Sequence, residues 1–148
     1  MHHPLHPALV HFPVTCWSLA VATDVASLWL GEAAWHWSDG LLAVGCAMAL
    51  VAMLAGMMEL SRVPEGAPMR DVWVHMGAML TAFTLFVVRW VLRLDHLQPM
   101  APDAASLALD AGGFLALAVG GWFGGRLVYG HGVGQRPDMN VHSVHRRR

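Results

Sequence analysis

The sequence predicts an all-α integral membrane protein, a four-helix bundle whose helices run up, down, up and down. Four apolar segments are long enough to cross a bilayer, which takes about 20 residues. The composition is 56 % hydrophobic and only 13 % charged, whereas charged residues make up about a quarter of an ordinary soluble domain. The connections are short, which favours antiparallel packing of consecutive helices. A soluble bundle would leave four apolar surfaces in water, which disfavours that alternative.

The first predicted span covers about residues 9–30 and the second about residues 40–60. Between them, the polar segment 32–39 is expected to form a loop whose tryptophans suit the membrane interface. Pro13 lacks the N–H that would bond to the carbonyl of Leu9, so the first span should bend there.

The third span is predicted at about residues 72–94 and the fourth at about residues 106–129. Together the four spans form one transmembrane domain, residues 1–134. The polar tail, residues 135–148, ends in three arginines and is expected to be disordered. The two cysteines, Cys16 and Cys46, lie in apolar segments without a C-x-x-C motif and are expected to be small buried residues.

Arginine is the only strongly basic residue type in the chain, and its distribution predicts the orientation. With four spans, both termini lie on one side of the membrane, and most arginines fall on that side: Arg62, Arg70, Arg126, Arg136, Arg146, Arg147 and Arg148. Only Arg89 and Arg93 fall on the other side. The positive-inside rule therefore predicts cytoplasmic termini. The formal net charge of −1 suggests no nucleic-acid partner.

Helical spacing predicts which polar side chains face the interior. Asp110, Leu117, Gly124 and His131 are spaced by sevens on the fourth span and share one face, and His75 shares a face with Arg89 on the third. We expect Arg89 to pair with Asp110, because an unpaired charge inside a membrane bundle is costly. The sequence pattern does not predict a role for Asp24.

A cluster of histidines is predicted at the opposite end of the bundle from that ion pair. It comprises His6, His11, His75 and His131, together with Glu59, because these residues begin or end their spans at the same level. A stripe of small and polar residues on the first span is expected to turn His11 inward. Three or four inward histidines at one depth favour a cofactor or metal over isolated structural histidines.

The motifs that carry these histidines resemble a known family. They are the opening His-Pro-x-x-x-His-Phe-Pro, the helical His75 and the closing Gly-Gly-Trp-Phe-Gly-Gly-x-Leu-Val-Tyr-x-His-Gly-Val-Gly. Together they resemble the bacterial domain-of-unknown-function 2231 family of small predicted membrane proteins. The resemblance implies a bacterial inner-membrane location and selects these residues: His6, Pro7, His11, Pro13, His75, Gly121, Gly124, Gly125, Tyr129, His131 and Gly132. Glu59 stands where an aspartate is commoner in the family.

The leading functional expectation is a small redox protein that binds b-type haem. The axial ligands would come from His11, His75 and His131, with His6 as an alternative and Glu59 orienting an imidazole. Family members are sometimes fused to Rieske or cytochrome domains, so the resemblance implies a separate redox partner or a larger complex here. Electron transfer, alone or as a subunit, is favoured over a stand-alone enzyme, and no catalytic residue is predicted.

Two alternatives stay open. The first is a non-haem iron, copper or zinc ion held by His11, His75, His131 and Glu59, because imidazole suits all three metals. The second is an accessory subunit without chemistry of its own, whose glycine faces serve packing.

Overall fold

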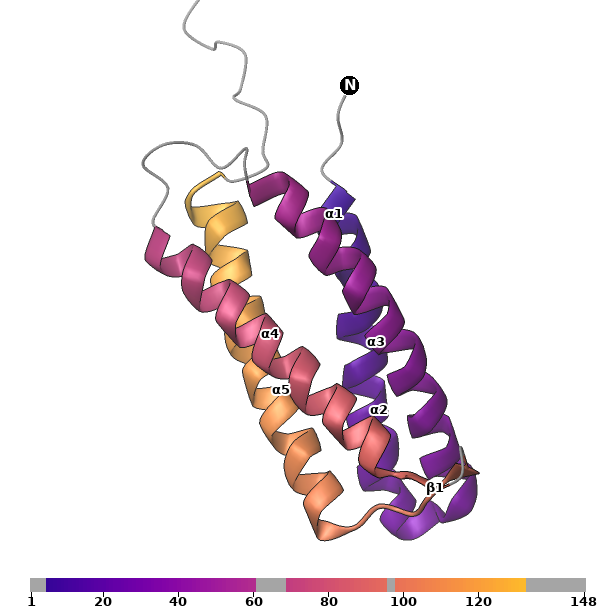
Figure 1. The fold of residues 1–148 in the computed structure, drawn as a ribbon. Helices are drawn as coiled ribbons and strands as arrows, with labels where there is room; N and C mark the ends of the chain where they lie inside the picture. The colour runs from indigo at the N-terminus through magenta and orange to yellow at the C-terminus, as the bar shows by residue number, and fades with distance from the viewer. Residues whose placement is uncertain (1–4, 61–68, 96–97, 133–148) are drawn as a thin grey trace, which may run out of the picture.

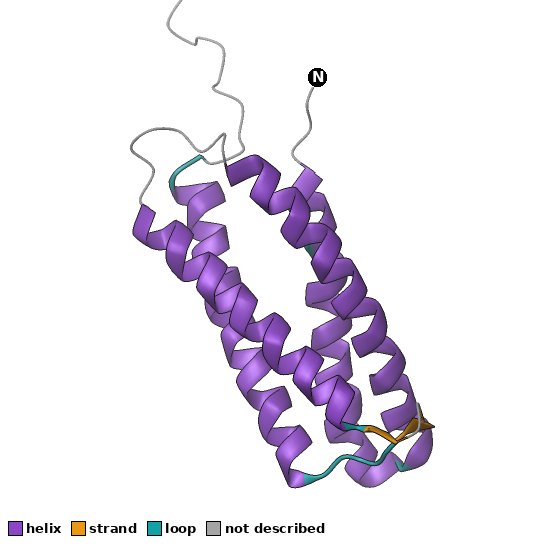
Figure 2. Ribbon diagram, in the orientation of Figure 1, coloured by secondary structure: helices purple, strands orange, loops and turns teal. Residues whose placement is uncertain are grey.

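The computed structural model describes residues 5–60, 69–95 and 98–132, and nearly all of them are helical (Figures 1 and 2). The elements in chain order are α1 (Leu5–Leu9), α2 (His11–Leu30), α3 (Glu32–Leu60), α4 (Met69–Leu92), β1 (Leu94–Asp95), β2 (Gln98–Pro99), α5 (Ala104–Gly125) and the π-helix η1 (Arg126–Gly130). The C-terminal tail predicted to be disordered lies outside the described residues.

Four helical stretches are long and apolar enough to cross a membrane: His6–Leu30, Glu32–Leu60, Met69–Leu92 and Ala104–Gly130. Large apolar side chains cover the outside of the bundle; Leu54, Trp73 and Leu115, for example, are 62–67 % exposed. Such a surface suits contact with lipid rather than water. The start of α1 and the end of η1 lie at the same end of the bundle (Figure 1). The chain is therefore an integral membrane four-helix bundle, as the sequence predicts.

The predicted loop at residues 32–39 is wrong, because α3 begins at Glu32 and only Gly31 separates it from α2. Gly31 has φ +74°, a left-handed conformation that costs a side-chain-bearing residue energy. The two alanines and Glu32 that follow are compatible with helix, and Glu32 lies in the first turn, where a negative charge is favourable. One glycine thus replaces the expected loop.

The first span is divided at Val10, between α1 and α2. Leu9 is the last residue of α1. Its carbonyl cannot accept a hydrogen bond from residue 13, because Pro13 has no main-chain N–H. Pro13 itself is buried. The interruption lies next to Pro13, where the bend was expected.

The third span ends at Leu92, two residues earlier than predicted, in a short antiparallel β1–β2 pair. The turn is held at its base, where the main-chain N–H of Met100 donates to the carbonyl of Arg93 over 2.9 Å. Asp103 then caps α5: its side chain accepts from the main-chain N–H of Ser106 over 2.7 Å. That hydrogen bond lowers the pKa of Asp103, because it stabilises the carboxylate.

The bundle is made of two helical hairpins, α1 and α2 with α3, and α4 with α5 and η1, and contacts within each hairpin greatly outnumber those between them. Within each hairpin, buried glycines let large side chains approach the neighbouring backbone. Trp17 packs on Gly45, and Phe86 packs on Gly113, where an added Cβ would lie 2.8 Å and 2.9 Å from the respective rings. Trp17 and Phe86 also stack on each other across the hairpin interface, with ring centroids 4.9 Å apart.

Candidate functional site

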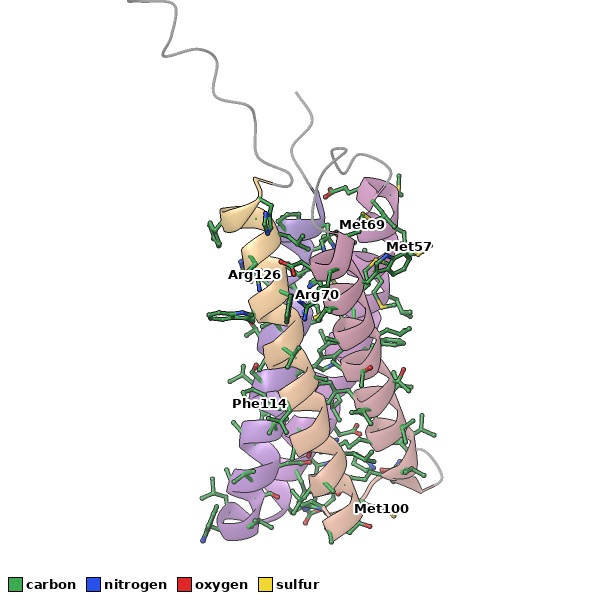
Figure 3. All side chains as sticks on the ribbon, turned by 90° about the vertical axis from the view of Figure 1, so that its left-hand side faces the viewer. Met57, Met69, Arg70, Met100, Phe114 and Arg126 are labelled. Atoms are coloured by element: carbon green, nitrogen blue, oxygen red, sulfur yellow. The ribbon has the colours of Figure 1, made fainter. Side chains whose placement is uncertain are left out.

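Polar side chains gather at the two ends of the bundle, separated by an apolar core. We call the end that holds His6, His75 and His131 the histidine end. The opposite end, which holds Asp24, Arg89, Arg93 and Asp110, is the ion-pair end. The core between them consists of buried apolar side chains: Trp17, Ala20, Leu42, Cys46, Ala49, Ala82, Phe86 and Leu117. Figure 3 shows Arg126 and Arg70 near the histidine end and Met100 at the ion-pair end.

At the histidine end, His75 projects from α4 toward α5. Its Nδ1–H donates to the carbonyl of Gly120 over 2.8 Å, so Nε2 keeps its lone pair in the neutral ring. Gly124 lies directly beneath this ring, because an added Cβ would come within 2.9 Å of it. The glycine face of the fourth span therefore makes room for the histidine of the third.

His6 is held in the same way on the other hairpin. Its Nδ1–H donates to the carbonyl of Ala52 over 2.7 Å, which again leaves Nε2 with a lone pair. A Cβ added at Gly56 would lie 3.0 Å from the ring. The rings of His6 and His75 meet edge-on across the hairpin interface, with centroids 6.4 Å apart and planes at 81°.

Glu59 lies beside His6 and contacts its main chain. The carboxylate accepts the main-chain N–H of His6 over 3.2 Å, whereas the Nδ1–H of each ring goes to a main-chain carbonyl. Metal-binding histidines are commonly fixed through their second nitrogen by a carbonyl or a carboxylate. Here backbone carbonyls of α3 and α5 fill that role.

His131 is placed at the end of η1, away from these two rings. Its Nε2 lies 3.4 Å from Oδ2 of Asp71, which also lies 3.1 Å from Nη2 of Arg126. Asp71 is buried in the first turn of α4. These contacts join α4 to η1 and engage His131 with a carboxylate rather than with His6 or His75.

The predicted inward direction of His11 is wrong, because the structure places this side chain on the exposed surface. The interior face of α2 is instead formed by Pro13, Trp17, Ala20 and Asp24. Trp17 is the largest side chain on this face and is fully buried, and its burial favours turning this face inward. The stripe of small and polar residues, including His11 and Thr15, consequently faces outward.

Among the residues that the structure describes, no group of three or more His, Cys, Asp or Glu side chains is arranged to hold a metal ion. The predicted set of His11, His75, His131 and Glu59 is not brought together. His6 and His75 meet instead, one from each hairpin. His6 was predicted only as an alternative ligand.

At the ion-pair end, the predicted contact between Arg89 and Asp110 is confirmed, with Nε and Oδ1 3.1 Å apart. Arg89 also pairs with Asp24 and donates to the hydroxyl of Ser38 over 2.7 Å. Arg93 pairs with Asp24 over 2.5 Å. All four helices α2 to α5 thus contribute a polar group to one buried network.

The inward position of Asp24 was not predicted, although the sequence carries a signal for it. Asp24 follows Trp17 by seven residues, so the two share a helix face, and a tryptophan-centred inward face would have turned Asp24 inward too. The charges are buried, since Arg89 and Asp24 are both 0 % exposed. Arg93 lies just beyond the span, and burial lowers its pKa because the charged guanidinium loses hydration.

Comparison with known proteins gives one match. The family described as a predicted membrane protein, domain of unknown function 2231, matches residues 2–137. No curated protein and no solved structure matches the chain. The matched region includes all four spans and both polar ends. The chain belongs to this family of predicted membrane proteins.

Proposed function

We propose that the chain is a small membrane redox protein that binds one b-type haem between His6 and His75 and transfers electrons, alone or as a subunit of a larger complex. The observation that carries the proposal is the pair of adjacent imidazoles. Each ring is fixed through Nδ1 and keeps Nε2 for a ligand. The two rings come from different hairpins and meet at one depth.

The spacing of the rings fits a shared metal centre. Two imidazoles that bind one metal ion from opposite sides, with metal–nitrogen bonds of about 2 Å, have ring centroids about 6 Å apart. The centroids of His6 and His75 lie 6.4 Å apart. The separation is therefore compatible with ligation of one metal centre by both imidazoles.

The number of ligands favours haem over a bare ion. Structural and catalytic zinc ions usually take three or four protein ligands, whereas haem iron already has four porphyrin nitrogens and needs only axial ligands. The described residues supply two imidazoles at this point and no cluster of three or more metal-ligating side chains. When bound, haem would supply a one-electron redox couple. The protein's part is to hold the two imidazoles in place and to surround them with apolar helices.

A non-haem iron, copper or zinc ion is the second candidate, favoured by the carboxylate of Glu59 next to His6. An accessory subunit without a cofactor is the third. The proposed setting is the bacterial inner membrane with cytoplasmic termini, so that the histidine end faces the cytoplasm. Support comes from Arg70 and Arg126, which are exposed at the histidine end, whereas Arg89 and Arg93 are buried in ion pairs.

The deciding experiment is an absorption spectrum of the detergent-purified protein, oxidised and then reduced with dithionite, with metal analysis of the same sample. We expect a sharp reduced α-band typical of b-type haem and about one haem per chain. His6→Ala and His75→Ala should each lose most of this band. His11→Ala and His36→Ala are matched controls with exposed rings, and both should retain it.

Other results would select between the alternatives. A colourless protein that carries one or two metal ions per chain would replace the haem proposal with the non-haem metal site. A protein with neither colour nor metal, from cells supplied with both, would leave the accessory-subunit candidate.

A further inference from the structure

Most buried residues of the first hairpin recur in the second at a nearly constant spacing; Cys46 is an exception, because Phe114, 68 positions later, is exposed. Four buried residues of α2 are Pro13, Trp17, Ala20 and Asp24. Asp24 and Arg93 are 69 positions apart. The residues 69 positions after these four are also buried: Ala82, Phe86, Arg89 and Arg93. In the second helices the spacing is one residue shorter. The five buried residues of α5 are Ser106, Asp110, Gly113, Leu117 and Gly120. They correspond in order to five buried residues of α3: Ser38, Leu42, Gly45, Ala49 and Ala52.

Contacts inside the two hairpins obey the same correspondence. His6 packs on a glycine of α3 and donates to the carbonyl four residues before that glycine; His75 does both on α5. Eleven residues farther along each first helix, Trp17 and Phe86 occupy equivalent places on glycines of their own hairpins. Helical periodicity alone can repeat a burial pattern, but it does not reproduce these specific side-chain contacts.

The counterparts also touch each other along one line. His6 meets His75 with ring centroids 6.4 Å apart, and Trp17 stacks on Phe86 at 4.9 Å. Farther along, Asp24 pairs with Arg93 at 2.5 Å. When two similar units are related by a two-fold axis, equivalent residues meet each other at that axis. The three contacts therefore place such an axis lengthwise through the bundle.

We propose that the two hairpins are equivalent halves related by this axis, and that they recognise each other through opposite charges at one pair of equivalent positions, Asp24 and Arg93. Two copies of the first hairpin would bring Asp24 against Asp24, and two copies of the second would bring Arg93 against Arg93. Like charges in a dry interior repel strongly. The partner that fits the inner face of each hairpin is thus the other hairpin. This inference stands on packing and charge, and it does not depend on haem.

Charge exchange in the full chain tests the recognition. Asp24→Arg and Arg93→Asp should each lower the midpoint of thermal unfolding in detergent by about 10 °C or more, because each leaves buried like charges together. The double variant restores one acidic and one basic group across the axis and should recover at least half of the larger loss. Glu32→Arg is the control, because Glu32 is an exposed acid at the same end; it should unfold close to the wild type.

A double variant no more stable than its less stable parent would overturn the charge recognition. If the reversed variants cannot be purified, Asp24→Asn, Arg93→Gln and their combination provide the same comparison without repulsion. There, the loss in the double variant should be smaller than the two single losses added together, and simple addition would contradict the pairing.

Exchange of the stacked rings tests the equivalence of the halves separately. Trp17→Phe leaves unfilled space, and Phe86→Trp overpacks the same axis, so each should lower the unfolding midpoint. If the halves are equivalent, combining the two exchanges the rings across the axis and should give a midpoint above that of either single variant. A double variant whose losses simply add would show that the positions are not equivalent.

Discussion

The imidazoles of His6 and His75 are each fixed by two features of the neighbouring helix. A main-chain carbonyl accepts the Nδ1–H, and a glycine leaves room for the ring. Main-chain carbonyls move less than flexible carboxylate side chains, so the direction of each ring is set by the packing of the helices. The glycines at positions 56 and 124 therefore matter as much to the site as the histidines do.

Gly124→Ala tests this dependence. The new methyl group would lie 2.9 Å from the ring of His75, so the ring must shift and its hydrogen bond to Gly120 should weaken. We expect haem retention to fall about tenfold, equivalent to about 1.4 kcal/mol, as measured by haem content after dilution into haem-free detergent. Gly121→Ala is the matched control, because nothing lies within 4 Å of its added Cβ. Equal retention in the two variants would contradict the role of Gly124.

At the scale of the helices, the number of membrane spans and the contact between two of them were predicted better than the residues at which the helices begin and end. Hydropathy and length located four spans, because lipid requires about 20 apolar residues whatever their order. The pairing of Arg89 with Asp110 was also predictable. A spacing of seven residues puts each side chain on the inward face of its helix, and an unpaired charge in that interior would be costly.

Two local predictions failed for identifiable reasons. The segment from Glu32 to Asp39 is polar, but polarity does not prevent helix formation at a membrane interface. His11 lies on a stripe of small residues, a pattern that often marks helix contacts. The burial of Trp17 outweighed that pattern and rotated the stripe outward. The meeting of His6 with His75 could not be predicted, because it depends on the docking of the two hairpins.

The one-residue connection between α2 and α3 gives a prediction at this scale. Gly31→Ala should destabilise the protein by about 1–2 kcal/mol, because a Cβ is unfavourable at φ +74°. Gly40→Ala, in the interior of α3 with open space around it, should instead stabilise by up to about 1 kcal/mol. Chemical denaturation of the two variants in detergent measures both values. Destabilisation of similar size in both would contradict the conformational explanation.

At the scale of the whole molecule, the two polar ends differ in the charge they present. The arginines at the ion-pair end, Arg89 and Arg93, are buried against Asp24 and Asp110. At the histidine end, Arg126 keeps half of its side chain exposed although it pairs with Asp71. Among the described residues, exposed positive charge is therefore concentrated at the histidine end, which supports the proposed cytoplasmic location of that end.

Fusion reporters after Arg148 test this orientation. A fluorescent protein that folds in the cytoplasm should be bright at this position, and an alkaline phosphatase that needs the periplasm should be inactive. The reverse pair of results would place the histidine end outside the cytoplasm. Both reporters use the same junction, so their signals refer to the same position in the chain. Immunoblotting measures the amount of each fusion, and each signal is divided by that amount.

The stacked rings of Trp17 and Phe86 have a consequence for transport. With the apolar residues around them, they fill the middle of the bundle, and the core cluster contains no carboxylate, imidazole or hydroxyl group. Protons cross membrane proteins along chains of such groups or of water. This cluster therefore offers no side-chain route for protons between the two polar ends. If the two imidazoles take up or release protons in the proposed function, we expect the exchange to occur at the histidine end.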